Sequence, residues 1–277
     1  MEEKTPYQEK IFYDQYRGYF DLNEKLLGVV DRVLQSKVIK HDNDSLKMTA
    51  IYFMTKAIKT NRAVRHLCAD GYGEDAAILI RSLFNLIINF YFILSQDTEN
   101  RAKRFIYHSA YTKYESYKIM SKWVDVFKQL DLQTFNASEI RKEAENAQKQ
   151  YKFEANKPWS NKTILQMAKD IDAHSSPKNN SMEKNYDVVY NFLSDFEHSN
   201  VMSANSYIKD DENGWYPQIN PTDNLIPETL ASDTGYLLMI FEQFCNIFQL
   251  DAKKDIKDLC AELENLKNMP PKKNLKS

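Results

Sequence analysis

Residues 73–94 read GEDAAILIRSLFNLIINFYFIL, and this stretch decides the fold. From residue 76 on it is almost wholly apolar apart from Arg81, Asn85 and Asn89, so a helix formed by it must be buried on nearly all sides. Glu74 and Asp75 suit the first turn, where exposed N–H groups favour negative charge. The run is near membrane-spanning length, but Arg81 lies inside it, and an arginine at depth in hydrocarbon costs about 2.5 kcal/mol or more. We therefore predict a buried central helix.

The chain on both sides of this run repeats apolar residues at helical spacing. Asp44 or Ser45 can cap a helix that Gly71 and Gly73 close. The segment 136–150 has helical propensity but almost no apolar face, so we expect it to project into solvent or to pack against a partner. Helices are expected at about 7–35, 45–67, 74–94, 99–130, 136–150, 163–171, 186–198, 228–250 and 255–266.

One β-hairpin interrupts the helices. Two short β-prone runs, 206–209 and 215–219, flank a polar stretch with an Asn-Gly turn signal, and Pro217 limits the second run to an edge. The polar tip, 210–214, should be exposed. The predicted fold is all-α, a multi-helix bundle with one short β-hairpin insertion, in a single domain over 1–268 with a loose tail over 269–277.

Composition excludes several classes of protein. The formal net charge of -2 over 277 residues gives no global signature of nucleic-acid or anionic-membrane binding. Cys68, Cys245 and Cys260 show no C-x-x-C spacing, and the first residues carry no export signal, so we expect reduced thiols and a cytoplasmic protein. The sequence has no P-loop, no G-x-S-x-G, no H-E-x-x-H and no paired-cysteine zinc pattern. We therefore expect no cofactor and no metal.

Arg81, Asn85 and Asn89 recur at every fourth position and form a polar stripe on the central helix. Buried polar groups without partners would cost about 1–3 kcal/mol each, so Arg81 should meet a carboxylate or several carbonyls. Glu197, Asp195 or Asp233 can supply it. The stripe is either a satisfied network that fixes helix packing or part of a ligand or catalytic site.

A second candidate lies at the end of the helix at 186–198. Ser194 and His198 share one face there, and a helix C-terminus favours a protonated imidazole. His198 is therefore a possible acid–base group, although a single histidine in this position more often ends a helix or joins the core.

Residues in three of the predicted helices resemble a known family. Arg81-Ser-Leu-Phe-Asn85, the basic start Arg101-Ala-Lys-Arg-Phe105 and the later Tyr190-Asn-Phe-Leu-Ser-Asp-Phe-Glu-His198 are similar to the bacterial domain of unknown function 5677 over about 45–250. That family is all-helical, is similar to HEPN domains, and typically shows R-S-L-x-E and S-x-x-x-H. The resemblance makes Arg81, Asn85, Ser194 and His198 candidate catalytic residues. Asn85 stands where the family usually has Glu, which keeps hydrogen bonding but removes the charge.

HEPN ribonucleases use an R-x4-6-H motif, and one stretch fits its spacing. Arg101 and His108 are separated by six residues and are secondary candidates. A match of this length arises easily by chance, so the constellation of Arg81 with His198 stays the main one.

Two functions follow from these observations. The first is a non-enzymatic binding module, in bacterial stress or phage defence, that binds a protein partner or a second copy of itself. The second is a metal-independent HEPN-like ribonuclease, which needs Arg and His together in an open basic cleft, with RNA as partner. No membrane partner is expected. We expect His198 to approach Arg81, and Asp195 and Glu197 beside it to repel phosphate, which favours the binding module.

Overall fold

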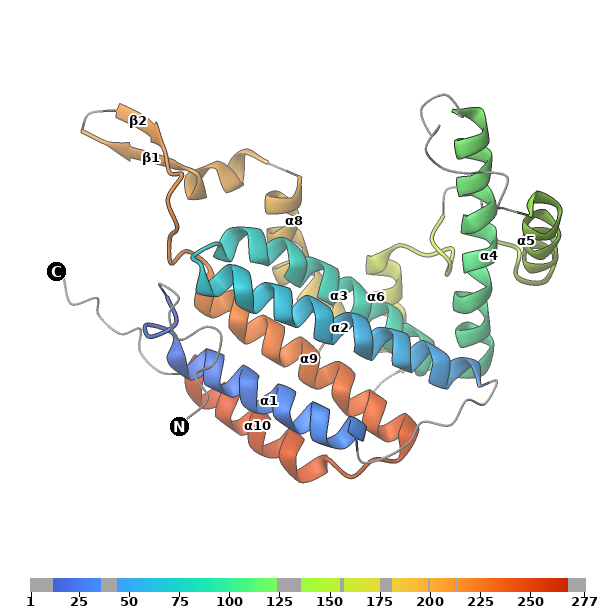
Figure 1. The fold of residues 1–277 in the computed structure, drawn as a ribbon, viewed down its shortest axis with the longest axis horizontal. Helices are drawn as coiled ribbons and strands as arrows, with labels where there is room; N and C mark the ends of the chain where they lie inside the picture. Colours follow the sequence, from blue (N-terminus) through green and yellow to red (C-terminus); the bar gives the residue numbers. More distant parts are fainter. Residues whose placement is uncertain are drawn as a thin grey trace.

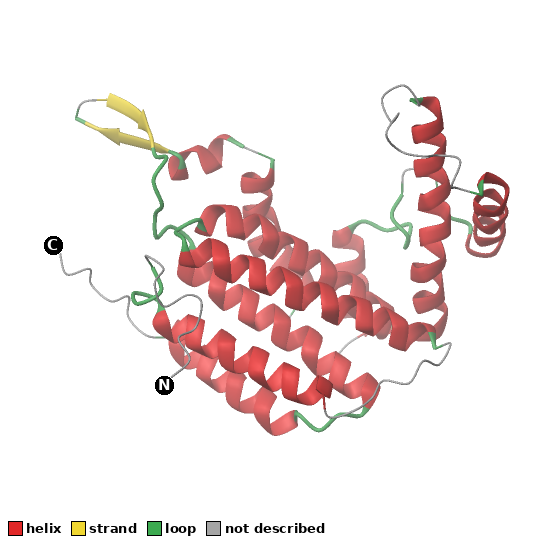
Figure 2. Ribbon diagram, viewed as in Figure 1, coloured by secondary structure: helices red, strands yellow, loops and turns green. Residues whose placement is uncertain are grey.

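The computed structural model describes residues 12–35, 44–123, 136–154, 157–174, 181–198, 200–212 and 214–268. Nearly all regular structure is helical, as Figure 2 shows. The predicted all-α fold with one short hairpin is confirmed. The elements are α1 (Arg17–Gln35), α2 (Ser45–Ala69), α3 (Gly73–Ser95), α4 (Thr98–Lys122), α5 (Ala137–Tyr151), α6 (Ile164–His174), α7 (Met182–Asn185), the π-helix η2 (Tyr186–Tyr190), α8 (Asn191–Glu197), the 3-10 helix η3 (Val201–Ser206), β1 (Ile208–Asp211), β2 (Gly214–Pro217), α9 (Ile226–Phe248) and α10 (Lys253–Lys267).

The core of the bundle lies between α2, α3 and α9, with α1 and α10 packed along α9 (Figure 1). Helix α3 is the central helix that the apolar run predicts, because most of its side chains, such as Phe84 and Phe90, are fully covered. Among the described residues it alone is long and apolar enough to cross a membrane, and 56% of its most apolar window is buried inside the bundle. The apolar surface of α3 is therefore covered by the helices that pack against it.

The residues at the two ends of α2 suit the backbone geometry there. Asp44 caps the start of α2 by accepting from the Lys47 N–H at 3.0 Å, as expected. After α2, Gly71 has φ +85, a conformation that side chains rarely adopt. At Gly73 an added Cβ would lie 2.1 Å from the Asn224 carbonyl oxygen. These glycines let the start of α3 press against the chain that leads into α9.

Two groups of elements project from the bundle (Figure 1). One is α4 with α5 packed along it. The expectation that 136–150 nearly lacks an apolar face is wrong: Ile140, Ala144, Ala147 and Tyr151 recur on one side of α5 and are buried. Two of the four are alanines, which carry little apolar signal in the sequence, yet they allow α5 to lie close to α4. The predicted extension of α4 to 130 and the tail over 269–277 lie outside the described residues.

The second consists of η2 and α8, which pack against α3, and of η3, β1 and β2, which project beyond them; we call these five elements together the apolar arm. Its two strands pair antiparallel, with Ile208 opposite Pro217 and Asp210 opposite Trp215. The strands therefore reach further into the predicted tip than expected, since β1 includes Asp210. The side chains described at the tip, Asp210 and Glu212, are exposed, as predicted.

Candidate functional site

The polar stripe of α3 faces the apolar arm. Arg81 forms an ion pair with Glu197 at the end of α8, and its Nη2 donates a hydrogen bond of 2.8 Å to the Tyr190 hydroxyl. The guanidinium also lies 4.4 Å from the centre of the Tyr190 ring. Only 11% of the Arg81 side chain is exposed, compared with 42% for Glu197. The predicted carboxylate partner of Arg81 is therefore Glu197.

Sequence reasoning missed Tyr190, the residue that contacts Arg81 through both its ring and its hydroxyl. Tyr190 ends the π-helix η2, a rare local geometry that often marks functional sites. Its ring stacks on Tyr186, with centroids 4.6 Å apart. The sequence held one signal for this contact. Tyr190 begins the stretch that ends at His198, and a tyrosine ring can form a cation–π contact with an arginine.

The other two members of the stripe continue it toward α4. Asn89 accepts a 2.5 Å hydrogen bond from the Trp159 indole and donates one of 2.7 Å to the Asn85 carbonyl. The side-chain oxygen of Asn85 is buried, and none of the described residues donates a hydrogen bond to it. Arg81 Nε is also buried, and none of the described residues accepts a hydrogen bond from it. The stripe is thus partly satisfied by protein groups, with two buried polar atoms left at its centre.

His198 lies at the rim of this site. It ends α8, and its backbone N–H donates to the Ser194 carbonyl at 3.0 Å. Its side chain is 68% exposed, and Nε2 lies 3.8 Å from a Glu197 carboxylate oxygen. Arg81 and His198 therefore meet the same carboxylate, which lies between them. The expected approach of His198 to Arg81 takes place through Glu197.

Asp233, another possible partner for Arg81, lies in a different network. Its Oδ2 accepts from Asn61 at 2.7 Å and from Asn23 at 3.2 Å, between α9, α2 and α1. Burial raises the pKa of the Asp233 carboxyl to about 8, although the two asparagine donors and the charge of Arg65 oppose the shift. The carboxyl is therefore mostly protonated at neutral pH. Asp233 does not serve the candidate site.

Arg101 and His108 have structural contacts at the base of α4. Arg101 donates to the Phe92 carbonyl and to Ser95 Oγ at 2.9 Å, and its guanidinium lies 3.8 Å from the centre of the Phe92 ring. The His108 ring packs 4.9 Å from the Phe153 ring, and burial, with the nearby charge of Arg104, lowers its pKa. The two residues lie about two turns apart on the helix, and each is engaged in its own packing contacts.

Across the described part of the chain, no group of three or more His, Cys, Asp or Glu side chains is placed to hold a metal ion. What the site does contain is a buried arginine, a carboxylate shared with an exposed histidine, and a phenol.

Comparison with protein families gives one match. The model of DUF5677, a family of unknown function, matches residues 47–214, which is more than half of the 277 residues. The chain belongs to the DUF5677 family. No curated protein matches the chain, and no solved structure matches it.

The DUF5677 match places the candidate site within the family's own span. It begins at residue 47, near the start of α2, and it includes Arg81, Tyr190, Glu197 and His198. It ends at residue 214, before α9, although α9 packs against both α2 and α3. The resemblance seen in the sequence extended to about residue 250, so the match starts at nearly the same place and ends earlier.

Proposed function

We propose that this DUF5677 protein is a non-enzymatic binding module of the bacterial cytoplasm, acting in stress or phage defence, and that its apolar arm docks a protein partner. The arm exposes large apolar side chains that the bundle does not cover. Val201 is 79% exposed and Trp215 82%, and Phe192 on α8 and Val188 on η2 are exposed as well; Ile219, two residues after β2, is 80% exposed. Exposed apolar side chains that gather on one part of a protein commonly mark an interaction surface. This exposure is the observation that carries the proposal.

The arrangement of the polar site supports binding over cleavage. An arginine that stabilises a transition state must offer its donors to the substrate, but the two terminal nitrogens of Arg81, Nη1 and Nη2, are directed to Glu197 and Tyr190. His198 has a carboxylate as its neighbour, and a carboxylate beside it repels phosphate. Arg81 therefore anchors the base of the arm to α3, through Tyr190 of η2 and Glu197 of α8.

The alternative is a metal-independent HEPN-like ribonuclease. One observation favours it: Arg81 and His198 contact the same carboxylate, so a movement of Glu197 toward solvent would leave an arginine beside an exposed histidine. General acid–base catalysis needs such a pair.

The binding proposal is tested by removing apolar surface from the arm. A partner captured from the source cells is identified, purified and titrated against wild type and Val201→Ser/Trp215→Ser. The matched control is Ile119→Ser/Trp123→Ser, which removes one aliphatic and one aromatic exposed side chain at the end of α4. We expect the arm variant to raise Kd at least about tenfold, equal to about 1.4 kcal/mol, and the control to bind like wild type. Equal affinity of wild type and the arm variant would refute the proposal.

A further inference from the structure

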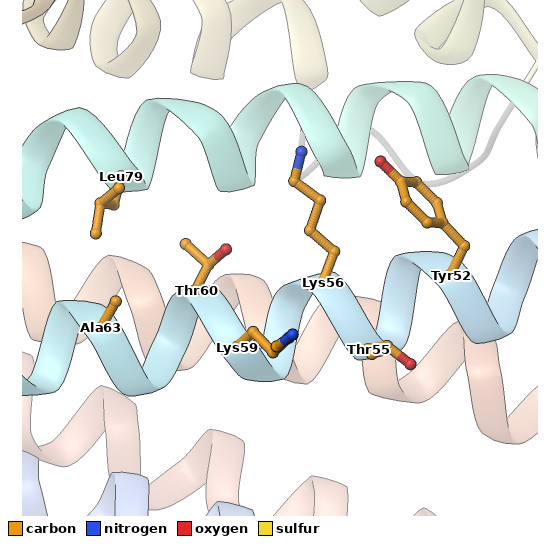
Figure 3. Close-up of a pocket in the computed structure, with 7 residues that line it drawn as sticks. All are labelled: Tyr52, Thr55, Lys56, Lys59, Thr60, Ala63 and Leu79. Carbon is orange, nitrogen blue, oxygen red and sulfur yellow. The ribbon is translucent and has the colours of Figure 1, made fainter. Parts of the chain in front are cut away.

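A groove with apolar walls and a basic rim lies on the bundle, between the outer face of α2 and α3. It encloses about 500 Å³, within the range of sites that take a large side chain or a small ligand. Figure 3 shows Tyr52, Lys56 and Ala63 along α2 and Leu79 reaching down from α3. Ala63 and Leu79 form apolar wall at one end, and the Tyr52 ring forms wall at the other.

The Tyr52 wall is fixed in place by other rings. Its ring centroid lies 5.4 Å from that of Phe53 and 5.9 Å from that of Phe105 on α4. Packing on two sides limits the rotation of this tyrosine, while its remaining face is exposed. An apolar group that enters the groove therefore meets a preformed aromatic surface.

The rim of the groove is positively charged. Lys56 and Lys59 are exposed, and no acidic residue occurs anywhere in α2. On α3, Glu74 and Asp75 lie in the first turn, before Leu79, and neither lines the groove. Within the described structure neither lysine has an ion pair, whereas Lys25 is paired with Glu262. The groove thus has two ammonium groups available for an incoming carboxylate.

The hairpin of the apolar arm presents the complementary chemistry. Residues opposite each other in antiparallel strands lie on the same face, and alternate residues along a strand share that face. The pairs Ile208 with Pro217 and Asp210 with Trp215 therefore lie on one face of the sheet. This face carries an exposed indole, an exposed aliphatic side chain and one carboxylate.

We propose that the hairpin of one copy of this protein docks into the α2–α3 groove of a second copy. Trp215 packs against the exposed face of the Tyr52 ring, and the Asp210 carboxylate pairs with the lysines at the rim. The inference rests on the proposed binding function and names the partner of the hairpin. In Figure 1 the hairpin points away from the middle of α2 in the same chain, so a contact between the two surfaces joins two molecules.

The contact joins two different surfaces, and each copy has both. Such heterologous contacts either close, when each hairpin occupies the other copy's groove, or continue from copy to copy. In both cases the mass in solution depends on protein concentration. Charge complementarity and one buried aromatic anchor per contact fit an association in the micromolar range.

Sedimentation of the full chain over a range of concentrations tests the contact. We expect the wild-type mass to rise with concentration from 32.5 kDa, toward twice that value if the contact closes and beyond it if the contact continues. Asp210→Lys should remain a monomer, because its hairpin then repels its groove, and Lys56→Glu/Lys59→Glu should remain a monomer for the same reason. Lys254→Glu/Lys257→Glu, a matched change of two exposed lysines on α10, should associate like wild type.

Mixing the two repelling proteins gives the decisive result. Every hairpin in the mixture then finds a groove of opposite charge on the other protein, so we expect the mixture to associate although neither protein does so alone. Circular dichroism confirms that each protein is folded. A mixture that stays monomeric, or a wild type that is monomeric at all concentrations, overturns the self-docking. In that case, the binding function would still be supported if Val201→Ser/Trp215→Ser lost affinity for a different protein that wild type binds.

Discussion

At the residue scale, Arg81 has a buried charge that three separate interactions offset. An arginine whose side chain is only 11% exposed loses most of its hydration, and here an ion pair, a phenol oxygen and an aromatic face replace it. All three come from η2 and α8. The arginine therefore couples the central helix to the base of the apolar arm.

Replacing Arg81 tests this coupling. Arg81→Met keeps the apolar packing of the stem but removes the charge and the hydrogen bond to Tyr190. We expect a loss of about 1–3 kcal/mol in the free energy of unfolding, measured by urea denaturation. Arg81→Lys should not restore the loss, because an ammonium group cannot reproduce the contacts with the Tyr190 ring and hydroxyl and the pairing with Glu197 together. A stability equal to wild type in both variants would show that Arg81 does not hold the arm.

Asp233 leads to a pH-dependent prediction. Its pKa of about 8 in the folded protein lies well above its ordinary value, so the folded state keeps a proton that the unfolded state releases. Stability from this group is therefore fully present below about pH 4 and is lost as the pH rises toward 8. Asp233→Asn, which mimics the protonated acid, should raise Tm relative to wild type more at about pH 8 than at about pH 5. The same Tm difference at both pH values would argue against a protonated Asp233.

At the element scale, the sequence predicted helices better than it predicted their contacts. The apolar run of α3 and the Asp44 cap are local signals, and both were read correctly. The apolar face of α5 was missed because Ala144 and Ala147 carry little hydrophobicity although they are buried. Tyr190 was missed because its contact with Arg81 joins residues that are far apart in the chain. Periodicity reports which face of a helix is covered, but not which side chain covers it.

The hairpin should contribute little to the stability of the bundle. Its described side chains on β1 and β2, such as Trp215, are exposed, so folding gains little from their burial. Shortening the tip at 210–214 should change the free energy of unfolding by less than about 0.5 kcal/mol, measured by thermal and urea denaturation. A loss above about 2 kcal/mol would show that the hairpin packs on the bundle.

At the scale of the whole molecule, the fold needs more of the chain than the family match covers. Helix α9 buries thirteen side chains, among them Phe241 and Phe244, and it packs on α2 and α3. Residues 47–214 alone would expose those faces of α2 and α3. We expect that fragment to be aggregated or unfolded by circular dichroism, and 12–268 to fold cooperatively. A stable, cooperatively melting 47–214 fragment would contradict this description of the core.

We expect the protein to bind a partner and not to cleave RNA, and incubation with single-stranded RNA in a chelator distinguishes the two activities. Arg81 is held by Glu197 and Tyr190, and His198 lies beside the same carboxylate, so the RNA should remain intact with wild type and with His198→Ala. The readout is RNA length on a denaturing gel over a time course, with circular dichroism to confirm that both proteins are folded. Metal-free cleavage by wild type that is lost in folded His198→Ala would contradict the account and identify the protein as a ribonuclease.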